Sequence, residues 1–482
     1  MKKYYAIITL AGLVLCSLFG CKKTLEEKPR TFLDPDGFFN NPESYESAVK
    51  GIYDGVPDLL GGNIQMMREM FSDIYAAPSA SYEQALPTYR NAHEPFFYNT
   101  RQLWANCYSI IKNANFIIDK LGTAGIPDAA KTPLIAEAKC LRAYAYFNLV
   151  QFYGGVPMRI KPIQNYNELQ APRGTEEEAY KQIVEDLTAA EAGLKEEAPQ
   201  KGRVYKKVAT ALLAKVYLTM AGNPLNKTAY YVNARDKALE VIGDNKFQLV
   251  DDYAKVFQTT TYTTETIWGV LYVPGIGGNP IHGQTCTAPG FVTLLLPAPW
   301  FMNSFPKGDR RRSWGIRTTY KDPSGATLAP FFAKFIDTTF IDNGISPSGS
   351  GIVSMAVPLI RLSEMYLIAA EAENEINGPA AAYAYINKVR ARARENKNDA
   401  TQVPDLSGLT KPQFRDAVIL ERKWELHLEG STWMDMKRTN TFSKIQTVRG
   451  NNLIHAIGAY NQTWLIPDVE ITNNSIAQNP AY

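Results

Sequence analysis

The chain contains 482 residues with 51 basic and 48 acidic side chains, which leaves a formal net charge of +3. This balance lacks the excess of lysine and arginine that a nucleic-acid-binding domain carries. Five cysteines and four histidines are spread along the chain without the spacing of a disulfide framework or a zinc site. The sequence therefore predicts no metal and no cofactor.

The first twenty residues have the pattern of an export signal. A basic start precedes an uncharged, mostly apolar run over residues 4–19, which is shorter than the roughly 20 residues of a membrane-spanning helix. The motif LFGC at residues 18–21 resembles a bacterial lipobox, in which the cysteine is alkylated by a diacylglycerol and then acylated. We predict a lipoprotein signal peptide over residues 1–20 and lipid attachment at Cys21. The alternative is an ordinary signal peptide that ends near a cysteine.

The mature chain begins with a polar, proline-containing stretch over residues 21–33, which we interpret as a tether between the lipid and the fold. Asn41 and Pro42 then have the pattern of a helix start, with proline at the first helical position. Residues 75–98 mix proline, serine, asparagine and aromatic residues without a helical period. A loop of this length inside a domain is usually functional.

Helical periodicity follows this loop, because apolar residues recur every three or four positions. A double glycine followed by Pro157 ends the second of these helices, and Thr175 with three glutamates after it begins the third. Their lengths and their alternation of large and small residues favour antiparallel pairs of tetratricopeptide type over an irregular bundle. The helices are expected at residues 103–121, 134–153, 175–194, 204–222 and 229–243.

The composition changes between residues 247 and 358, where glycine, proline, threonine and aromatic residues replace the helical period. We expect a mainly α protein with one domain over residues 34–482, in which this irregular part interrupts a helical frame. The frame is expected at about 100–245 and 359–440. Short strands are expected at 265–272 and 332–337, helices at 359–378, 380–395 and 414–438, and an irregular tail from 464.

Several segments carry a resemblance to one family. They include EAKCLRAYAYFNLVQFYGGVPM at residues 137–158, ERKWELHLEGSTWMDMKR at 421–438 and IPDVEITNNSIAQNPAY at 466–482. The chain resembles the SusD/RagB family of nutrient-binding outer-membrane lipoproteins. The resemblance implies four tetratricopeptide-like helix pairs, an irregular part that carries the ligand, and no enzymatic activity. It also implies two partners, an oligosaccharide and a SusC-like TonB-dependent transporter on which the protein sits as a lid.

Glu421, Glu425 and Glu429 are spaced four residues apart and would share one helical face. Paired carboxylates carry out glycoside hydrolysis, so a glycan hydrolase is one hypothesis. We favour a structural lattice, because like charges on one helical face repel each other unless cations lie between them. The arginines expected to supply these cations are Arg361, Arg390, Arg394 and Arg438.

A sugar site needs aromatic platforms for the apolar faces of the ligand and polar groups for its hydroxyls. Loops are the expected place for such residues, and the stretches at 75–98 and 272–291 have this composition. The family shares no ligand motif, so composition and loop placement alone select the candidates. They are Tyr75, Tyr82, Tyr89, Asn91, Tyr272, Asn279, His282 and Gln284.

The leading hypothesis for function is capture of an oligosaccharide or polysaccharide and its delivery to the transporter. The alternatives are a lipid-anchored binder of a non-sugar nutrient such as peptides, a glycan hydrolase, and a repeat scaffold without a small ligand. The expected location is the outer membrane, with the protein facing the cell exterior. Lys22 and Lys23 stand where surface-exported members often carry acidic residues, although Glu26 and Glu27 follow, so an anchor that faces the periplasm is the alternative.

Overall fold

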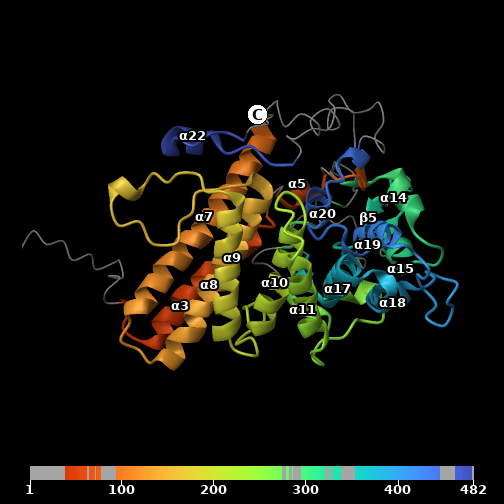
Figure 1. Ribbon diagram of the computed structural model, residues 1–482, viewed down its shortest axis with the longest axis horizontal. Helices are drawn as coiled ribbons and strands as arrows, with labels where there is room; N and C mark the ends of the chain where they lie inside the picture. The colour runs from red at the N-terminus through yellow and green to blue at the C-terminus, as the bar shows by residue number, and fades with distance from the viewer. Residues whose placement is uncertain are drawn as a thin grey trace, which may run out of the picture.

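A row of helices forms the frame of the molecule (Figure 1). The computed structural model describes residues 38–61, 64–70, 72–76, 94–273, 278–281, 285, 295–319, 321, 325, 327, 329–337, 353–445 and 462–479, with residues 66, 67, 70 and 94–99 described by their backbone only. Within this part of the chain, each of eight long helices packs against the next. They are α7 (Glu94–Thr123), α8 (Asp128–Tyr153), α9 (Glu176–Gly193), α10 (Lys206–Ala221), α11 (Tyr230–Ile242), α17 (Leu362–Asn377), α18 (Pro379–Ala393) and α19 (Lys411–Leu426).

This packing order confirms the expected helix pairs. The pairs are α7/α8, α9/α10, α11/α17 and α18/α19, and the irregular part of the chain lies between the two members of the third pair. One large hydrophobic core runs from the N-terminal helices to α17, and a smaller cluster fills the space between α17, α18 and α19. The frame is therefore continuous although its sequence is interrupted.

Local sequence explains where these helices begin and end. Thr175 caps α9 with a capping box, in which the Glu178 amide donates to Thr175 Oγ1 at 3.1 Å and the Thr175 amide donates to Glu178 Oε2 at 2.7 Å. Gly154 ends α8 with a φ of +74°, a backbone conformation that favours glycine. The next residue, Gly155, passes so close to the carbonyl oxygen of Gly174 that a side chain there would collide with it.

Shorter elements surround the frame. The helices are α3 (Pro42–Tyr53), α4 (Gly55–Asp58), α5 (Ile64–Met70), α12 (Tyr253–Phe257), α14 (Pro299–Ser304), α15 (Arg310–Ser313), α20 (Thr432–Arg438), α22 (Asp468–Asn474) and the 3₁₀ turn η2 (Tyr166–Glu168). The strands form three antiparallel pairs, β1 (Tyr75–Ala76) with β3 (Leu296–Pro297), β2 (Thr266–Val270) with β6 (Val357–Arg361), and β4 (Ile316–Arg317) with β5 (Phe331–Phe332). β6 runs directly into α17, so the β2–β6 pair joins the irregular part to the frame.

Some element boundaries differ from the expectation. α7 begins at Glu94, inside the stretch expected to be a loop, and the expected irregular tail contains α22. The strand expected over 332–337 is confined to Phe331–Phe332. The helix expected over 414–438 is broken after Leu426, and α20 begins at Thr432.

Buried polar groups account for the break after α19. The Lys334 amine donates to the carbonyl oxygens of Glu425 at 3.0 Å and His427 at 2.7 Å, and Arg361 donates to the Glu425 carbonyl at 2.7 Å. The amide of Leu428, which has a φ of +63°, donates to the Tyr75 hydroxyl at 3.0 Å. Side chains distant in sequence thus satisfy the backbone groups that a continuous helix would have paired.

No described helix combines the length and the apolar character that crossing a bilayer requires. The same part of the chain holds no group of three or more histidine, cysteine or acidic side chains placed to bind a metal ion.

Candidate functional site

Glu425 lies at the centre of a buried ion-pair lattice. Its carboxylate contacts Arg311 at 3.0 Å, Arg361 at 2.5 Å and Arg392, and its side chain is fully buried. Burial alone would raise the pKa of Glu425, but the guanidinium groups of Arg392, Arg361 and Arg311 outweigh it and hold the pKa well below its usual value. The carboxylate is therefore ionised at neutral pH.

The two neighbouring glutamates extend the lattice on either side. Glu421 contacts Arg311 and Arg390, each at 2.6 Å. Glu429, which lies beyond the end of α19, contacts Arg361 at 2.7 Å and Lys334 at 2.5 Å. Burial raises the pKa of Glu429, but Arg361 and Lys334 lower it further than burial raises it. The ion pairs expected from Arg361 and Arg390 are thus present.

Two of the expected arginines pair elsewhere. Arg394 follows the end of α18 with an extended backbone, so helical spacing does not apply to it, and its guanidinium contacts Asp405 at 2.6 Å. Arg438 lies on α20, after the break, and contacts Glu371 and Asp435, the latter at 2.8 Å. The prediction that Arg394 and Arg438 pair with the three glutamates is wrong.

Sequence reasoning missed three cations of this lattice. Arg392 belongs to the same RARAR run as Arg390 and Arg394. Arg390 and Arg392 lie on α18 and join the lattice, whereas Arg394 follows the end of α18 and does not. Arg311 comes from an RRR run in the irregular part, and Lys334 from a short turn after β5. The residues around Lys334 in the sequence are apolar and do not predict an ion pair there. Burial lowers the pKa of Lys334 to about 8.

This arrangement does not provide the chemistry of a glycoside hydrolase. Such an enzyme needs one carboxyl group with a raised pKa to act as an acid and a second carboxylate, both open to the substrate. Glu421 and Glu425 are fully buried and occupied by arginines. The lattice instead holds α18, α19, β6 and α15 together.

The candidate ligand residues are only partly covered by the described chain. Tyr82, Tyr89, Asn91, His282 and Gln284 lie outside the described residues. The other three, Tyr75, Tyr272 and Asn279, are in the described part of the chain.

Tyr75 and Asn279 lie in the core, which contradicts their expected place on a ligand-binding surface. Tyr75 is 2% exposed, and its hydroxyl donates to Glu69 at 2.8 Å. Asn279 is fully buried and donates through its side-chain amide to the carbonyl oxygen of Met355 at 3.3 Å. Neither side chain is therefore available to an external ligand.

Tyr272 occupies an intermediate position. Its ring is half-buried, and its hydroxyl is buried without a hydrogen-bond partner among the described residues. Burial raises the pKa of Tyr272, so the phenol remains neutral. Tyr272 therefore remains a candidate for ligand contact.

The anchors of the candidate loops are paired with one another. β1 directly precedes residues 77–93, and β3 directly follows residues 286–294, so the β1–β3 pair joins the bases of two segments. The Trp300 indole donates to the Asp73 carbonyl at 2.7 Å in the same region. The backbone amide of Asn279 donates to the backbone carbonyl of Val353 at 2.8 Å. This bond links the residues that follow segments 274–277 and 338–352.

The charged lattice reaches these anchors through α19. Lys423 forms a buried ion pair with Asp73 at 2.5 Å, and the Tyr75 hydroxyl receives the Leu428 amide. α19 and the residues that follow it thus fix Asp73 and Tyr75, at the start of β1.

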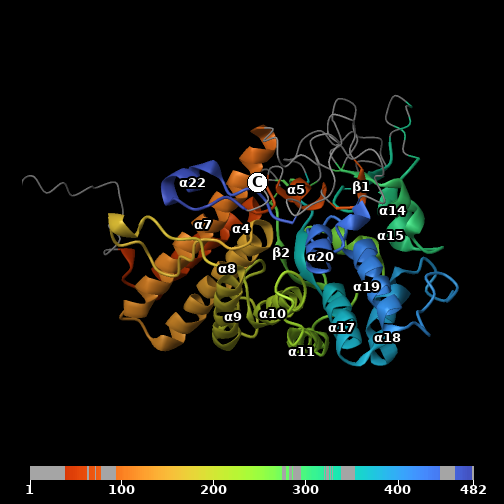
Figure 2. The same cartoon turned by 45° about the horizontal axis from the view of Figure 1, so that its top comes forward.

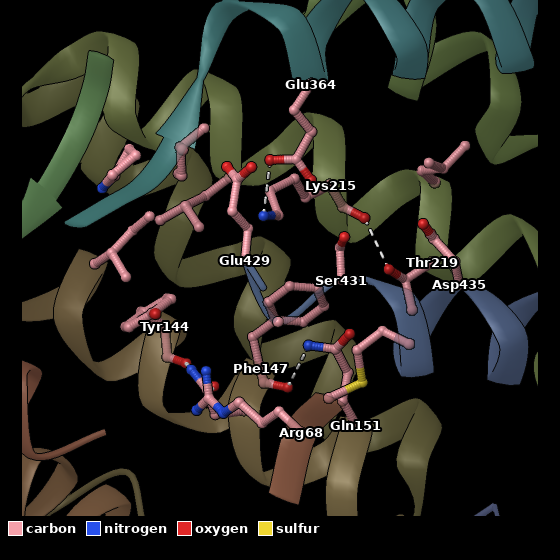
Figure 3. Close-up of a pocket in the computed structure, with 18 of the residues that line it drawn as sticks. Arg68, Tyr144, Phe147, Gln151, Lys215, Thr219, Glu364, Glu429, Ser431 and Asp435 are labelled. Atoms are coloured by element: carbon pink, nitrogen blue, oxygen red, sulfur yellow. Dashed lines mark hydrogen bonds and ion pairs between the residues drawn. The ribbon is translucent and has the colours of Figure 1, made fainter. Parts of the chain in front are cut away.

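A cavity behind the lattice is too small to be the ligand site. Its volume is about 80 Å³, whereas sites for small molecules begin at about 300 Å³. Lys215 and Glu364 pair across part of its wall at 2.9 Å, and Arg68 and Tyr144 line the opposite side (Figure 3). Its size and polar lining suit a few buried waters.

Comparison with known proteins assigns this architecture. A model described as the SusD family matches residues 307–478, and a model described as starch-binding, associating with outer membrane, matches residues 25–218. The chain belongs to the SusD family. The resemblance seen in the sequence motifs is thereby confirmed.

Individual SusD relatives cover nearly the whole chain. SusD-like protein P25 of Formosa agariphila is 27% identical over 86% of each chain. A SusD superfamily structure from Parabacteroides distasonis has a TM-score of 0.78 at 24% identity, covering 91% of this chain and 99% of that one. A laminarin-binding SusD-like protein has a TM-score of 0.74 at 23% identity, covering 92% and 100%. These structures establish the SusD fold, four helix pairs with an irregular insertion, for the present chain.

Proposed function

We propose that this protein is a lipid-anchored SusD-type binding protein that captures an oligosaccharide or polysaccharide and delivers it to a TonB-dependent outer-membrane transporter. The observation that carries the proposal is the match of residues 25–218 to a family described as starch-binding and associated with the outer membrane. A laminarin-binding protein with the same fold adds support for a glucan or a related glycan. Cys21 is the proposed lipid attachment site, and the protein faces the cell exterior.

The site geometry supports binding rather than catalysis. The dense acidic cluster is buried and paired with arginines and Lys334, and these arginines hold the pKa of Glu425 well below its usual value, so Glu425 is not an acid that could protonate a leaving group. The bases of the segments that carry Tyr82, Tyr89, Asn91, His282 and Gln284 are instead held by β1, β3 and the Asn279–Val353 hydrogen bond. We propose that these five residues and Tyr272 form the ligand-binding surface.

Retardation in native gels tests this function directly. The soluble protein, starting after Cys21, is run through gels that contain laminarin, starch or another neutral polysaccharide. We expect one polymer class to retard the protein. Tyr82→Ala and Tyr89→Ala are expected to weaken binding roughly tenfold, about 1.4 kcal/mol, because an aromatic platform for the sugar is lost.

Tyr166→Ala is the matched control, since Tyr166 is 89% exposed on η2 and lies outside the proposed surface. Wild-type mobility in every gel, together with binding of peptides in calorimetry, would replace the glycan with a non-sugar nutrient. Release of new reducing ends from the polymer would contradict the absence of enzymatic activity.

A further inference from the structure

A second groove lies between α7 and α22. It is bounded by α7, by residues 157–163 and by α22, which lies beside α7 in both views (Figure 1, Figure 2). Its volume is about 460 Å³, within the range of about 300–1,000 Å³ that small-molecule sites occupy. Tyr272, the described member of the proposed ligand-binding surface, does not line it.

The groove is preformed by hydrogen bonds to the backbone of its second wall. The Tyr108 hydroxyl donates to the Pro157 carbonyl at 2.7 Å, and the Asn115 amide donates to the Arg159 carbonyl at 2.9 Å. Arg142 in turn donates to Asn115 Oδ1 at 2.7 Å and fixes the orientation of that amide. Ligand binding here would require little ordering of the chain.

α22, the third wall of the groove, is held by contacts with α7 and with Ala171. Arg101 on α7 pairs with Asp468 at the start of α22 at 2.7 Å. The Ala171 amide donates to Asn474 Oδ1 at 3.3 Å, and the Asn474 amide donates to Glu470 at 2.5 Å. α22 is therefore a built wall of the groove and not a loose tail.

The floor and rim provide apolar surface. The Trp104 and Tyr108 rings lie 5.1 Å apart in the floor, and Trp104 is 3% exposed. Phe116 at the rim is 37% exposed, and Ile163 opposite is 45% exposed. An exposed phenyl ring beside a groove suits the apolar face of a sugar ring.

The charges around this apolar surface are mainly positive. Lys112 and Lys161 are exposed, and the described residues offer neither of them a carboxylate partner. Among the described residues, the Arg159 guanidinium donates to the backbone carbonyls of Glu168 and Leu169 and pairs with no carboxylate. Within the described lining, Glu470 is the single carboxylate. An anion with an apolar face therefore complements the groove better than a neutral or cationic ligand does.

We propose that this groove is a second carbohydrate site that binds an acidic sugar unit, in which Phe116 stacks on the ring and Lys112 and Lys161 bind its anionic group. The anionic group is a uronate carboxylate or a sulfate ester. This site goes beyond the proposed function, because it adds an electrostatic preference at a groove that Tyr272 does not line.

The test uses the soluble protein after Cys21 with polysaccharides that differ in charge. Polygalacturonate supplies carboxylates, carrageenan supplies sulfate esters, and dextran is neutral. We expect retardation by one or both anionic polymers and at least tenfold weaker binding in the double variant Lys112→Gln/Lys161→Gln and in Phe116→Ala. Raising NaCl from about 50 to about 500 mM is expected to weaken binding in the same direction.

Matched control variants distinguish binding in the groove from nonspecific attraction to surface lysines and from binding at the first site. Lys388 is exposed on α18 without an ion-pair partner among the described residues, so Lys388→Gln removes a charge far from the groove. Val232→Ala removes an apolar side chain that is 41% exposed on α11. Both controls, and Tyr82→Ala, are expected to keep wild-type affinity for the anionic polymers.

The outcomes are distinguishable from those of the first site. Loss of anionic binding in the groove variants supports the second site whether or not neutral glycans bind. Anionic binding that survives the groove variants, or that Tyr82→Ala abolishes, overturns it. Absence of binding to every anionic polymer, or binding only to phosphatidylglycerol vesicles, also overturns it.

Discussion

Glu425 and Arg361 form an ion pair at 2.5 Å in which neither side chain is more than 1% exposed. Arg361 comes from the end of β6 and Glu425 from the last turn of α19. The same guanidinium contacts Glu429 at 2.7 Å and donates a hydrogen bond to the backbone carbonyl oxygen of Glu425 at 2.7 Å. Arg361 also pairs with Glu265 at 2.8 Å, so one arginine contacts three carboxylates and donates to the last turn of α19.

Glu425→Ala is expected to destabilise the protein strongly. The substitution leaves Arg311, Arg361 and Arg392 buried with one anion fewer, and breaking a buried pair by removing one partner typically costs 3–5 kcal/mol. Urea unfolding followed by circular dichroism measures the loss. Any glycan affinity of the folded fraction should be unchanged, because Glu425 is fully buried and is not among the proposed ligand-binding residues.

Glu197→Ala is the control for this prediction. Glu197 pairs with Lys246 at 2.8 Å, but both side chains are more than half exposed, and exposed pairs contribute little to stability. Equal stability of Glu425→Ala and Glu197→Ala would show that the lattice does not hold the frame.

His427 should make the protein sensitive to mild acid. Its ring lies between Phe301 and Phe332, with centroids at 5.8 and 5.3 Å, and its Nε2 has no partner among the described residues. Burial, followed by the charge of Lys334, lowers the pKa of His427 well below 6.5. Below pH 6.5 the unfolded chain therefore binds a proton that the folded chain does not, and stability falls as the pH falls.

The measurement compares the wild type with His427→Phe between pH 7 and pH 5. The wild type is expected to lose up to about 1.4 kcal/mol more per pH unit below about 6.5, because only its unfolded state titrates at this position. Other groups titrate in both proteins and cancel in the difference. Parallel pH profiles of the two proteins would mean that folded His427 accepts the proton.

Sequence patterns predicted the helical frame because helix signals are local. The capping box at Thr175 and the glycine at 154 mark ends that neighbouring residues determine, and both appear where expected. The break after Leu426 was not predictable in this way. It depends on Tyr75, Lys334 and Arg361, which reach the end of α19 from distant parts of the chain.

The candidate site was less predictable for the same reason. Composition placed Tyr75 and Asn279 on a ligand surface, but pairing of β1 with β3 and of Asn279 with Val353 places both in the core. Helical spacing found Arg390 but also selected Arg394, since the sequence does not show that α18 ends at Ala393. Partners contributed by the irregular part, such as Arg311, have no fixed spacing to the glutamates they bind.

Gly155 and Gly51 should respond to alanine in opposite directions. A Cβ on Gly155 would collide with the backbone carbonyl of Gly174, which cannot rotate away, so Gly155→Ala is expected to cost about 1–3 kcal/mol. Gly51 lies within α3 with no atom within 4 Å of a Cβ, so Gly51→Ala is expected to stabilise by up to about 1 kcal/mol. Thermal unfolding measures both, and a tolerated alanine at 155 would contradict the close backbone approach.

Cys21→Ser should release the protein from the membrane. The lipobox interpretation makes Cys21 the site of the thioether-linked lipid, and each buried methylene contributes about 0.8 kcal/mol to anchoring, so loss of the chains removes the anchor. Metabolic labelling with a palmitate analogue and fractionation of cells expressing the full chain measure this. Wild type is expected to be labelled and to sediment with the outer membrane, and Cys21→Ser to be unlabelled and soluble. Cys286→Ser keeps the lipobox and is the control, expected to behave as wild type.

A labelled, membrane-bound Cys21→Ser protein would favour an ordinary signal peptide that ends near a cysteine. It would assign the anchor to another part of the chain.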